Sequence, residues 1–295
     1  MRGARIVLIH GRAQQGKSEE ILKNEWLSPL REALGTRASV LDECEVRTPF
    51  YGDTLAELVE TLGDAVPDDI IVRGTDEGID NSYRNLLAEH LEAVREQEGI
   101  TEEQILAEAN LLVTQRGPQN WPWVLAIVRT LNRIPGLDGD MIERILRDVW
   151  IYLERRSVRK TINAIVAPAF ETDLPMVVVA HSLGSVVAYD ILRDMTGRNV
   201  SHLLTVGSPL GLEIARKALS PIGHPTVVGR WFNSRDKRDI VALYPLDKQY
   251  FKIDPAIEDY SGVRNRTSNA HGIRGYLSDT VTVDRLYAAL RRATE

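Results

Sequence analysis

The sequence predicts an α/β fold built on a mostly parallel central sheet with helices on both faces. Short β-branched runs alternate with longer helical patterns along most of the chain, as in β-α-β units. Residues 176–179 are apolar without alternation, as expected for a central strand that helices cover on both faces. The chain has 295 residues, of which 43% are hydrophobic, so it can form a large core without a disulfide or a metal.

The expected elements follow this alternation from the N-terminus onward. They are a strand at residues 5–9, a helix at 16–34, strands at 69–73 and 175–180, a helix at 185–194 and a strand at 201–206. Residues 230–241 form a further strand followed by a loop with two carboxylates, and a last helical pattern ends at Arg292. This order predicts a single domain over residues 1–295.

Residues 85–147 interrupt the alternation. They contain a charged helical pattern at 89–108, and then Trp121 and Trp123 in a stretch with Gly and Pro. We expect an inserted helical cap here, in which the tryptophans either pack the insertion onto the core or form a lid over an apolar site. Apolar residues at helical spacing over 141–165 predict one amphipathic helix leading back to the sheet.

Composition and charge restrict the partners. The net charge is −6 and the arginines are interspersed with acids, which argues against nucleic acid as a partner. The single cysteine, Cys44, and the absence of zinc-ligand spacing predict no disulfide, no metal and no cofactor. No apolar stretch approaches the roughly 18 residues of a membrane span, so we expect a cytoplasmic protein without integral membrane association. The sequence leaves the oligomeric state open.

One motif suggests phosphate binding. The segment from Gly11 to Ser18 satisfies G-x-x-x-x-G-K-[ST], in which Lys17 would contact phosphate oxygens and Ser18 a magnesium ion. Such an enzyme also needs a second strand ending in a carboxylate, for which only residues 40–43 are a weak candidate. The competing interpretation makes Ser18 the N-cap of a helix whose first turn carries acidic residues. A P-loop nucleotide-binding enzyme therefore stays an alternative.

A second motif indicates nucleophilic catalysis. In the segment from Ala180 to Gly184, a buried strand turns sharply at Ser182 into an apolar helix. A serine in such a nucleophile elbow has strained backbone angles, so the residues two before and two after it must be small. Ala180 and Gly184 meet this requirement.

A serine hydroxyl becomes a good nucleophile when an imidazole takes its proton and a carboxylate orients that imidazole. In the elbow fold these groups follow the serine in the order acid, histidine. His271 lies beyond both candidate acids, Asp236 and Asp239, in a turn-like segment before the last helix. The sequence therefore predicts a Ser182, His271 and Asp239 or Asp236 constellation.

Four segments together resemble the α/β-hydrolase superfamily, in particular its lipase and esterase-like members. They are His10-Gly11, Ala180-His181-Ser182-Leu183-Gly184, Asp239-Ile240-Val241 and His271-Gly272. The resemblance covers residues 6 to about 290 and implies an α/β-hydrolase fold with a cap or lid at 85–147. It departs from the family pattern at Ala180, where the consensus has glycine.

The resemblance also implies roles for individual residues. Asp239 is favoured over Asp236 as the triad acid, because an apolar residue follows the family's carboxylate. The backbone N–H groups of Arg12 and Leu183 would form the oxyanion hole. His10 and His181 would hold loops rather than transfer protons.

The predicted activity is that of a serine hydrolase of the carboxylesterase and lipase type. Ser182 would attack a small-molecule ester, a lipid acyl ester or a thioester, and water would resolve the acyl-enzyme. A non-catalytic binding member of the same fold stays open beside the P-loop alternative, because a fold does not determine a function.

Overall fold

The computed structural model of the chain describes residues 3–63, 81–108, 121–134, 137–266 and 269–295. Its described strands form one six-stranded sheet in the order β2-β1-β3-β4-β5-β6, and every neighbouring pair is parallel. The strands are β1 (Ala4–Ile9), β2 (Cys44–Arg47), β3 (Met176–His181), β4 (Val200–Val206), β5 (Val228–Asp236) and β6 (Glu258–Val263). The α/β class and the parallel sheet are thus confirmed.

The helices are mostly those that connect parallel strands. They are α1 (Glu19–Leu34), α2 (Gly52–Gly63), α4 (Asn81–Gln97), α5 (Glu102–Glu108), α6 (Trp121–Arg133), α7 (Gly139–Glu154), α8 (Arg156–Val166), α9 (Leu183–Asp194), α10 (Glu213–Ala218), α11 (Ile273–Tyr276) and α12 (Thr280–Thr294). The 3₁₀ helices of the described residues are η1 (Gly35–Glu43), η2 (Ala167–Phe170) and η3 (Pro209–Gly211). Among the described residues, none of the helices has the length and apolar character needed to cross a membrane.

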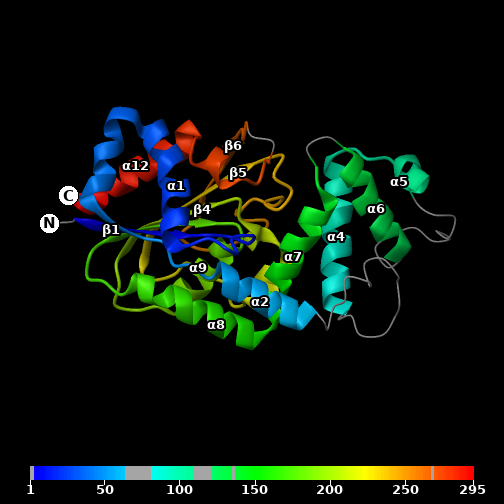
Figure 1. Cartoon of the computed structure of the whole chain (residues 1–295), viewed down its shortest axis with the longest axis horizontal. Coiled ribbons are helices and arrows are strands. Elements are labelled where there is room, and N and C mark those ends of the chain that lie inside the picture. Colours follow the sequence, from blue (N-terminus) through cyan, green and yellow to red (C-terminus); the bar gives the residue numbers. More distant parts are fainter. Residues whose placement is uncertain (1–2, 64–80, 109–120, 135–136, 267–268) are drawn as a thin grey trace. The chain divides into compact units, whose positions relative to one another are not determined.

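The sheet is covered on both faces. Figure 1 shows α1 and α12 on one face and α8 and α9 on the other. All six residues of β1 are buried, as are the first five of β3, which explains why these strands are apolar without alternation except at Arg5, whose guanidinium pairs with Glu45 at 3.0 Å. Side chains of α1 and α12 pack with alternate residues of β1 and β3 in one core cluster, whose members include Trp26, Leu8, Val179 and Leu286.

The chain divides into two compact units. The sheet unit comprises Met1–Ala56 and Tyr152–Glu295, and the helical unit comprises Glu57–Ile151. The predicted insertion at 85–147 falls within the helical unit. In that unit Tyr83 donates a hydrogen bond to the Glu143 carboxylate, and Trp123 is buried with its indole N–H 3.4 Å from a Glu92 oxygen.

Several predicted elements need correction. Residues 40–43 belong to η1 and not to a strand, so Asp42 and Glu43 precede β2 instead of ending it. The single helix expected over 141–165 is two helices, α7 and α8, because Arg155 adopts an extended backbone between them. The pattern at 89–108 is likewise divided between α4 and α5. The strand expected at 69–73 lies outside the described residues.

Two strands were not predicted from the sequence. Both β2 and β6 are edge strands, and only one residue of each is buried. The sequence of β6, EDYSGV, has neither the apolar run of a central strand nor a clean alternation. A half-exposed edge strand is stabilised by its neighbour's backbone hydrogen bonds, which leave no mark in the hydropathy pattern.

Candidate active site

The candidate nucleophile lies on a sharp turn at the carboxyl end of β3. Ser182 is buried, its φ is 54° and its ψ is −131°, and α9 begins at the next residue. A positive φ is strained for a residue with a side chain. A Cβ atom on Gly184 would lie 2.4 Å from the carbonyl oxygens of both Ile9 and His10. Glycine is therefore required there, as predicted, because the elbow packs directly against the end of β1.

Three residues that are far apart in the sequence meet at this turn. The Ser182 Oγ is 2.8 Å from the His271 Nε2, and the His271 Nδ1 is 2.8 Å from the Asp239 Oδ2. All three side chains are buried. An ionised carboxylate only accepts hydrogen bonds, so Nδ1 carries a proton and the Nε2 lone pair is available to the serine hydroxyl.

Each of the three residues follows a different parallel strand. Ser182 follows β3, Asp239 follows β5 and His271 follows β6. The carboxyl ends of parallel strands lie along one edge of a sheet, which is where open α/β sheets place their sites. The fold thus brings together three predicted residues that are far apart in the sequence.

The Asp239 carboxylate is held at both oxygens. Oδ1 accepts the backbone N–H of Val241 at 3.0 Å, and Oδ2 accepts the hydroxyl of Tyr276 at 2.5 Å in addition to His271. Burial by itself raises the pKa of the Asp239 carboxyl, but the neighbouring His271 and the hydrogen bonds from His271 and Tyr276 outweigh it and hold that pKa below its usual value. Asp239 is therefore an anion in the folded protein.

The rival carboxylate has a different set of partners. Asp236 accepts hydrogen bonds from the Arg238 guanidinium at 2.9 Å and from the Asn265 backbone N–H at 2.6 Å. The Asn265 side chain in turn donates to the carbonyls of Ala270 and Gly272, on either side of His271. Asp236 thus ties together the loops that follow β5 and β6, while Asp239 is the acid that contacts the histidine.

Two further residues belong to the site: Tyr276, which the sequence did not indicate, and Gly207, whose position after a strand predicted either an edge of the active-site pocket or a turn. Tyr276 donates to Asp239 and accepts the Asp236 backbone N–H at 3.2 Å, so it joins the two acidic positions. Gly207 has a φ of +58°, and a Cβ atom there would lie 3.0 Å from the Asp239 Oδ2 and 3.3 Å from the His271 Cε1. No sequence motif marks Tyr276. Gly207 was indicated only ambiguously, because a glycine directly after a strand is also typical of an ordinary turn.

The peptide between Ser182 and Leu183 is fixed through its carbonyl. Leu183 is the first residue of α9, so its N–H has no acceptor within the helix. The Ser182 carbonyl accepts the Ser185 hydroxyl at 2.6 Å, and the Ser208 Oγ lies 2.7 Å from the Ser185 Oγ. Ser185 has one proton and gives it to the carbonyl, so Ser208 donates to Ser185. Because the C=O and N–H of a trans peptide point in opposite directions, these hydroxyls also fix the direction of the Leu183 N–H.

The segment after β1 lies against the nucleophile. A Cβ atom on Gly11 would be 2.8 Å from the Ser182 Cβ, so only glycine allows this approach. The His10 Nε2 accepts the Tyr51 backbone N–H at 3.1 Å, and the His10 Nδ1 lies 2.7 Å from the Gly11 carbonyl. Since a backbone N–H only donates, Nδ1 carries the proton and holds the Gly11–Arg12 peptide by its carbonyl. Burial lowers the pKa of His10 to about 4, so this ring is neutral.

His181 holds the loop of His271, much as His10 holds the segment after β1. Its Nε2 donates to the backbone carbonyl of His271 at 2.8 Å, and the centroids of the two rings are 4.7 Å apart. Burial, and then the adjacent His271, lower the pKa of His181 to about 3. His181 is thus a neutral donor that holds the loop of His271.

The phosphate-loop candidate makes contacts that a phosphate would have to replace. The Lys17 ammonium is 2.6 Å from the Glu25 carboxylate, and the Gly16 N–H donates to the Asp53 carboxylate at 2.6 Å. The Ser18 Oγ accepts the Ile21 N–H at 3.2 Å, which confirms the N-cap interpretation. The described residues contain no cluster of three or more His, Cys, Asp or Glu side chains that could hold a metal ion.

Neither a protein-family model, nor a curated protein, nor a solved structure matches this chain. The geometry of the site is therefore the basis for a proposal about function.

Proposed function

We propose that this protein is a serine hydrolase with an α/β-hydrolase fold that cleaves carboxylic esters. The observation that carries the proposal is the hydrogen-bonded chain from Ser182 through His271 to Asp239, with the serine on a strained turn after a central strand. Nucleophile, base and orienting acid in hydrogen-bond contact are the arrangement that activates a serine hydroxyl. The order serine, acid, histidine along the chain is that of the elbow fold.

The reaction proceeds in two halves. The Ser182 Oγ attacks the ester carbonyl carbon while the His271 Nε2 takes its proton, and Asp239 stabilises the imidazolium that forms. When the bond to the alkoxide breaks, that proton passes from Nε2 to the leaving oxygen, and the acyl group stays on Ser182. A water molecule then gives a proton to Nε2 and attacks the acyl carbon, which releases the acid and returns the proton to Ser182.

The charge that develops on the carbonyl oxygen needs fixed donors. The backbone N–H groups of Arg12 and Leu183 are the proposed donors, because Gly11 and the elbow lie against each other. Both peptides are held at their carbonyl oxygens, one by the His10 ring and the other by the Ser185 hydroxyl. Donors that need no reorganisation during the reaction stabilise the transition state most effectively.

The helical unit Glu57–Ile151 supports a proposal about the substrate. It lies in the chain between the segment of Arg12 and the elbow, and it carries buried apolar helices such as α6. We propose that it forms the cap that selects an acyl or lipid substrate. If a variant with this unit replaced by a short linker folded and kept its acyl-chain-length preference, the cap proposal would be wrong.

The decisive experiment is covalent labelling with a fluorophosphonate probe, followed by peptide mass spectrometry. We expect an adduct on Ser182 in the folded protein, and none after heat denaturation or in His271→Gln. Ser278→Ala removes a hydroxyl from an exposed helix end and serves as the matched control that keeps full labelling. Absence of an adduct in the folded protein, or equal labelling of His271→Gln, would refute an activated serine.

A further inference from the structure

A cavity lies over the sheet at a distance from the candidate active site. It is open to solvent, has a volume of about 200 Å³ and lies between β4, β5 and α12, with the start of β6 along one side. His202 and Arg230 are paired neighbours in the first halves of β4 and β5, whereas Ser182, Asp239 and His271 follow the carboxyl ends of their strands. The cavity and the candidate active site are thus at opposite ends of the parallel strands.

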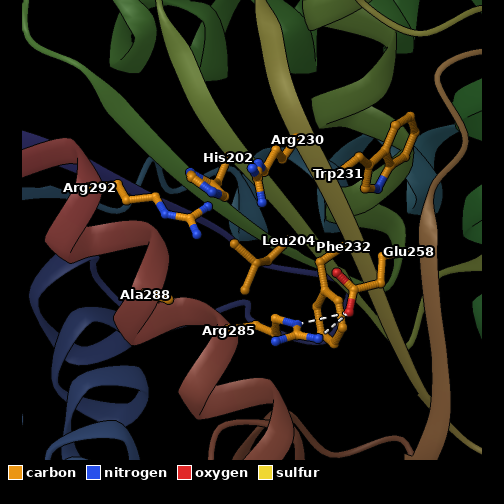
Figure 2. Close-up of a pocket in the computed structure, with 9 residues that line it drawn as sticks. All are labelled: His202, Leu204, Arg230, Trp231, Phe232, Glu258, Arg285, Ala288 and Arg292. Atoms are coloured by element: carbon orange, nitrogen blue, oxygen red, sulfur yellow. Dashed lines mark hydrogen bonds and ion pairs between the residues drawn. The ribbon is translucent and has the colours of Figure 1, made fainter.

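The cavity carries a net positive charge. Figure 2 shows Arg230 and Arg292 extending toward His202 from β5 and α12. Neither guanidinium makes a hydrogen bond or ion pair with any residue that the structure describes. Arg285 is different, because it pairs with Glu258 at 2.5 Å. Two solvent-exposed arginines without an acidic partner among the described residues thus converge here, in a chain whose net charge is −6.

His202 adds a basic nitrogen between the two arginines. The Ser201 hydroxyl donates to the Met176 carbonyl at 3.0 Å, so it accepts the His202 Nδ1–H at 3.2 Å. Nε2 is then the unprotonated nitrogen, and it has no hydrogen-bond partner among the residues described. Burial, and then Arg292 and Arg230, lower the pKa of His202.

The floor of the cavity is apolar. Leu204 and Phe232 are buried, and they point to the same face of the sheet as His202 and Arg230 because side chains alternate along a strand. Trp231 contributes to the lining, but its ring turns away from the other side chains (Figure 2). The Arg285 guanidinium lies 5.9 Å from the Phe232 ring centroid. A bound molecule would meet cationic groups at one end and a hydrocarbon surface at the other.

We propose that this cavity is a second binding site, which takes a small organic anion. Its carboxylate or phosphate head group binds between Arg230 and Arg292, beside His202, and its apolar body covers Leu204 and Phe232. Guanidinium groups bind oxyanions through paired, charge-assisted hydrogen bonds, and these two have no competing protein acid. The volume suits a molecule about the size of benzoate.

Isothermal titration calorimetry of the full chain tests the proposal with three probes, namely benzoate, inorganic phosphate and benzyl alcohol. We expect benzoate to bind, inorganic phosphate to bind more weakly because it lacks the apolar body, and benzyl alcohol not to bind in the same concentration range. Arg230→Gln with Arg292→Gln should weaken benzoate binding at least about tenfold. Ser182→Ala should leave it unchanged, which separates this site from the proposed catalytic one.

A matched control removes the same charge elsewhere. Arg156→Gln with Lys160→Gln neutralises two exposed side chains of α8, on the other face of the sheet. Benzoate affinity should be retained in this variant. An equal loss in both double variants, or equal binding of benzyl alcohol and benzoate, would overturn the site. Phosphate binding as tight as that of benzoate would overturn the role of the apolar floor.

A second measurement needs no arginine variant. The groups that face His202 are Arg230 on β5, Arg285 and Arg292 on α12 and Glu258 on β6, while its β3 neighbour Val177 is uncharged. A bound anion offsets the two free arginines, so benzoate should raise the pKa of His202, and benzoate should bind more tightly as the pH falls through that pKa. Proton NMR titration of the imidazole, assigned with His202→Gln, reports this shift. An unchanged titration at saturating benzoate would place the ligand elsewhere.

Discussion

Replacement of Asp239 by asparagine tests the site most directly, because both carboxylate oxygens accept hydrogen bonds and a neutral amide can accept at only one of the two positions. The Asp239 Oδ1 position faces the Val241 N–H at 3.0 Å, so the amide oxygen takes that place. The amide NH₂ then takes the Oδ2 position, 2.8 Å from the His271 Nδ1, and the Tyr276 hydroxyl, which donates to Oδ2 in the unmodified protein, has to turn and accept. An NH₂ group only donates, so it stabilises the His271 tautomer that carries its proton on Nε2.

The expected loss of kcat in Asp239→Asn follows from the loss of the His271 tautomer that can accept the serine proton. With a proton on Nε2, His271 has no lone pair for the Ser182 hydroxyl, and the anion that would stabilise the imidazolium is gone. The corresponding change in serine proteases lowers kcat by roughly 10⁴-fold, which is about 5 kcal/mol of transition-state stabilisation. We expect a loss of this size in Asp239→Asn, with little change in KM because the substituted group does not touch substrate.

The assay is steady-state hydrolysis of p-nitrophenyl butyrate, together with the rate of fluorophosphonate labelling. Asp236→Asn is the matched control: it changes a carboxylate three residues away whose partners are Arg238 and Asn265. Its kcat should stay within about tenfold of the unmodified protein. If Asp239→Asn kept kcat within tenfold while Asp236→Asn lost it, the assignment of the acid would be refuted.

Three further outcomes are expected. Ser185→Ala removes the hydroxyl that holds the Ser182 carbonyl, so kcat should fall roughly tenfold to a hundredfold with KM little changed, and an altered KM at unchanged kcat would argue against a positioning role. His10 and His181 have folded pKa values of about 4 and about 3, against 6.5 when unfolded, so the unfolded state binds more protons below pH 6.5. Urea titrations should therefore give a free energy of unfolding about 4 kcal/mol smaller at pH 5 than at pH 7.5. Equal values would contradict two neutral rings in the folded protein. Lys17→Ala breaks an exposed ion pair with Glu25 and should leave ester hydrolysis unchanged. If the unmodified protein bound a nucleotide and Lys17→Ala did not, the phosphate-loop interpretation would be supported instead.

The sequence predicted those parts of the site that are encoded by one continuous segment or by the order of residues along the chain. The elbow at Ser182 was visible because a strand, a serine, two small flanking residues and a helix stand in one continuous segment. His271 followed from chain order, since it is the histidine beyond both candidate acids. The choice between Asp239 and Asp236 depended on a resemblance, because a three-residue separation in one loop does not show which carboxylate turns toward the histidine.

Other features depend on contacts that no segment contains by itself. Tyr276 reaches Asp239 from the helix after the histidine loop, and Ser208 reaches Ser185 from the neighbouring strand's end. The break between α7 and α8 at Arg155 occurs without glycine or proline, so the apolar periodicity continued through it. Such features follow from tertiary packing, which overrides local propensity.

The site contains three histidines, and what distinguishes them is the partner of each ring. His10 is buried and His181 is partly buried, each ring bonds to backbone groups, and both have pKa values far below 6.5. His271 is the one whose Nδ1 meets a carboxylate, at Asp239. Protonation of His271 during attack would be opposed by a positive charge on His181, whose ring centroid is 4.7 Å away. A neutral His181 therefore favours the proposed role of His271 as base, because the imidazolium of His271 would lie beside the Asp239 anion and not beside a second cation.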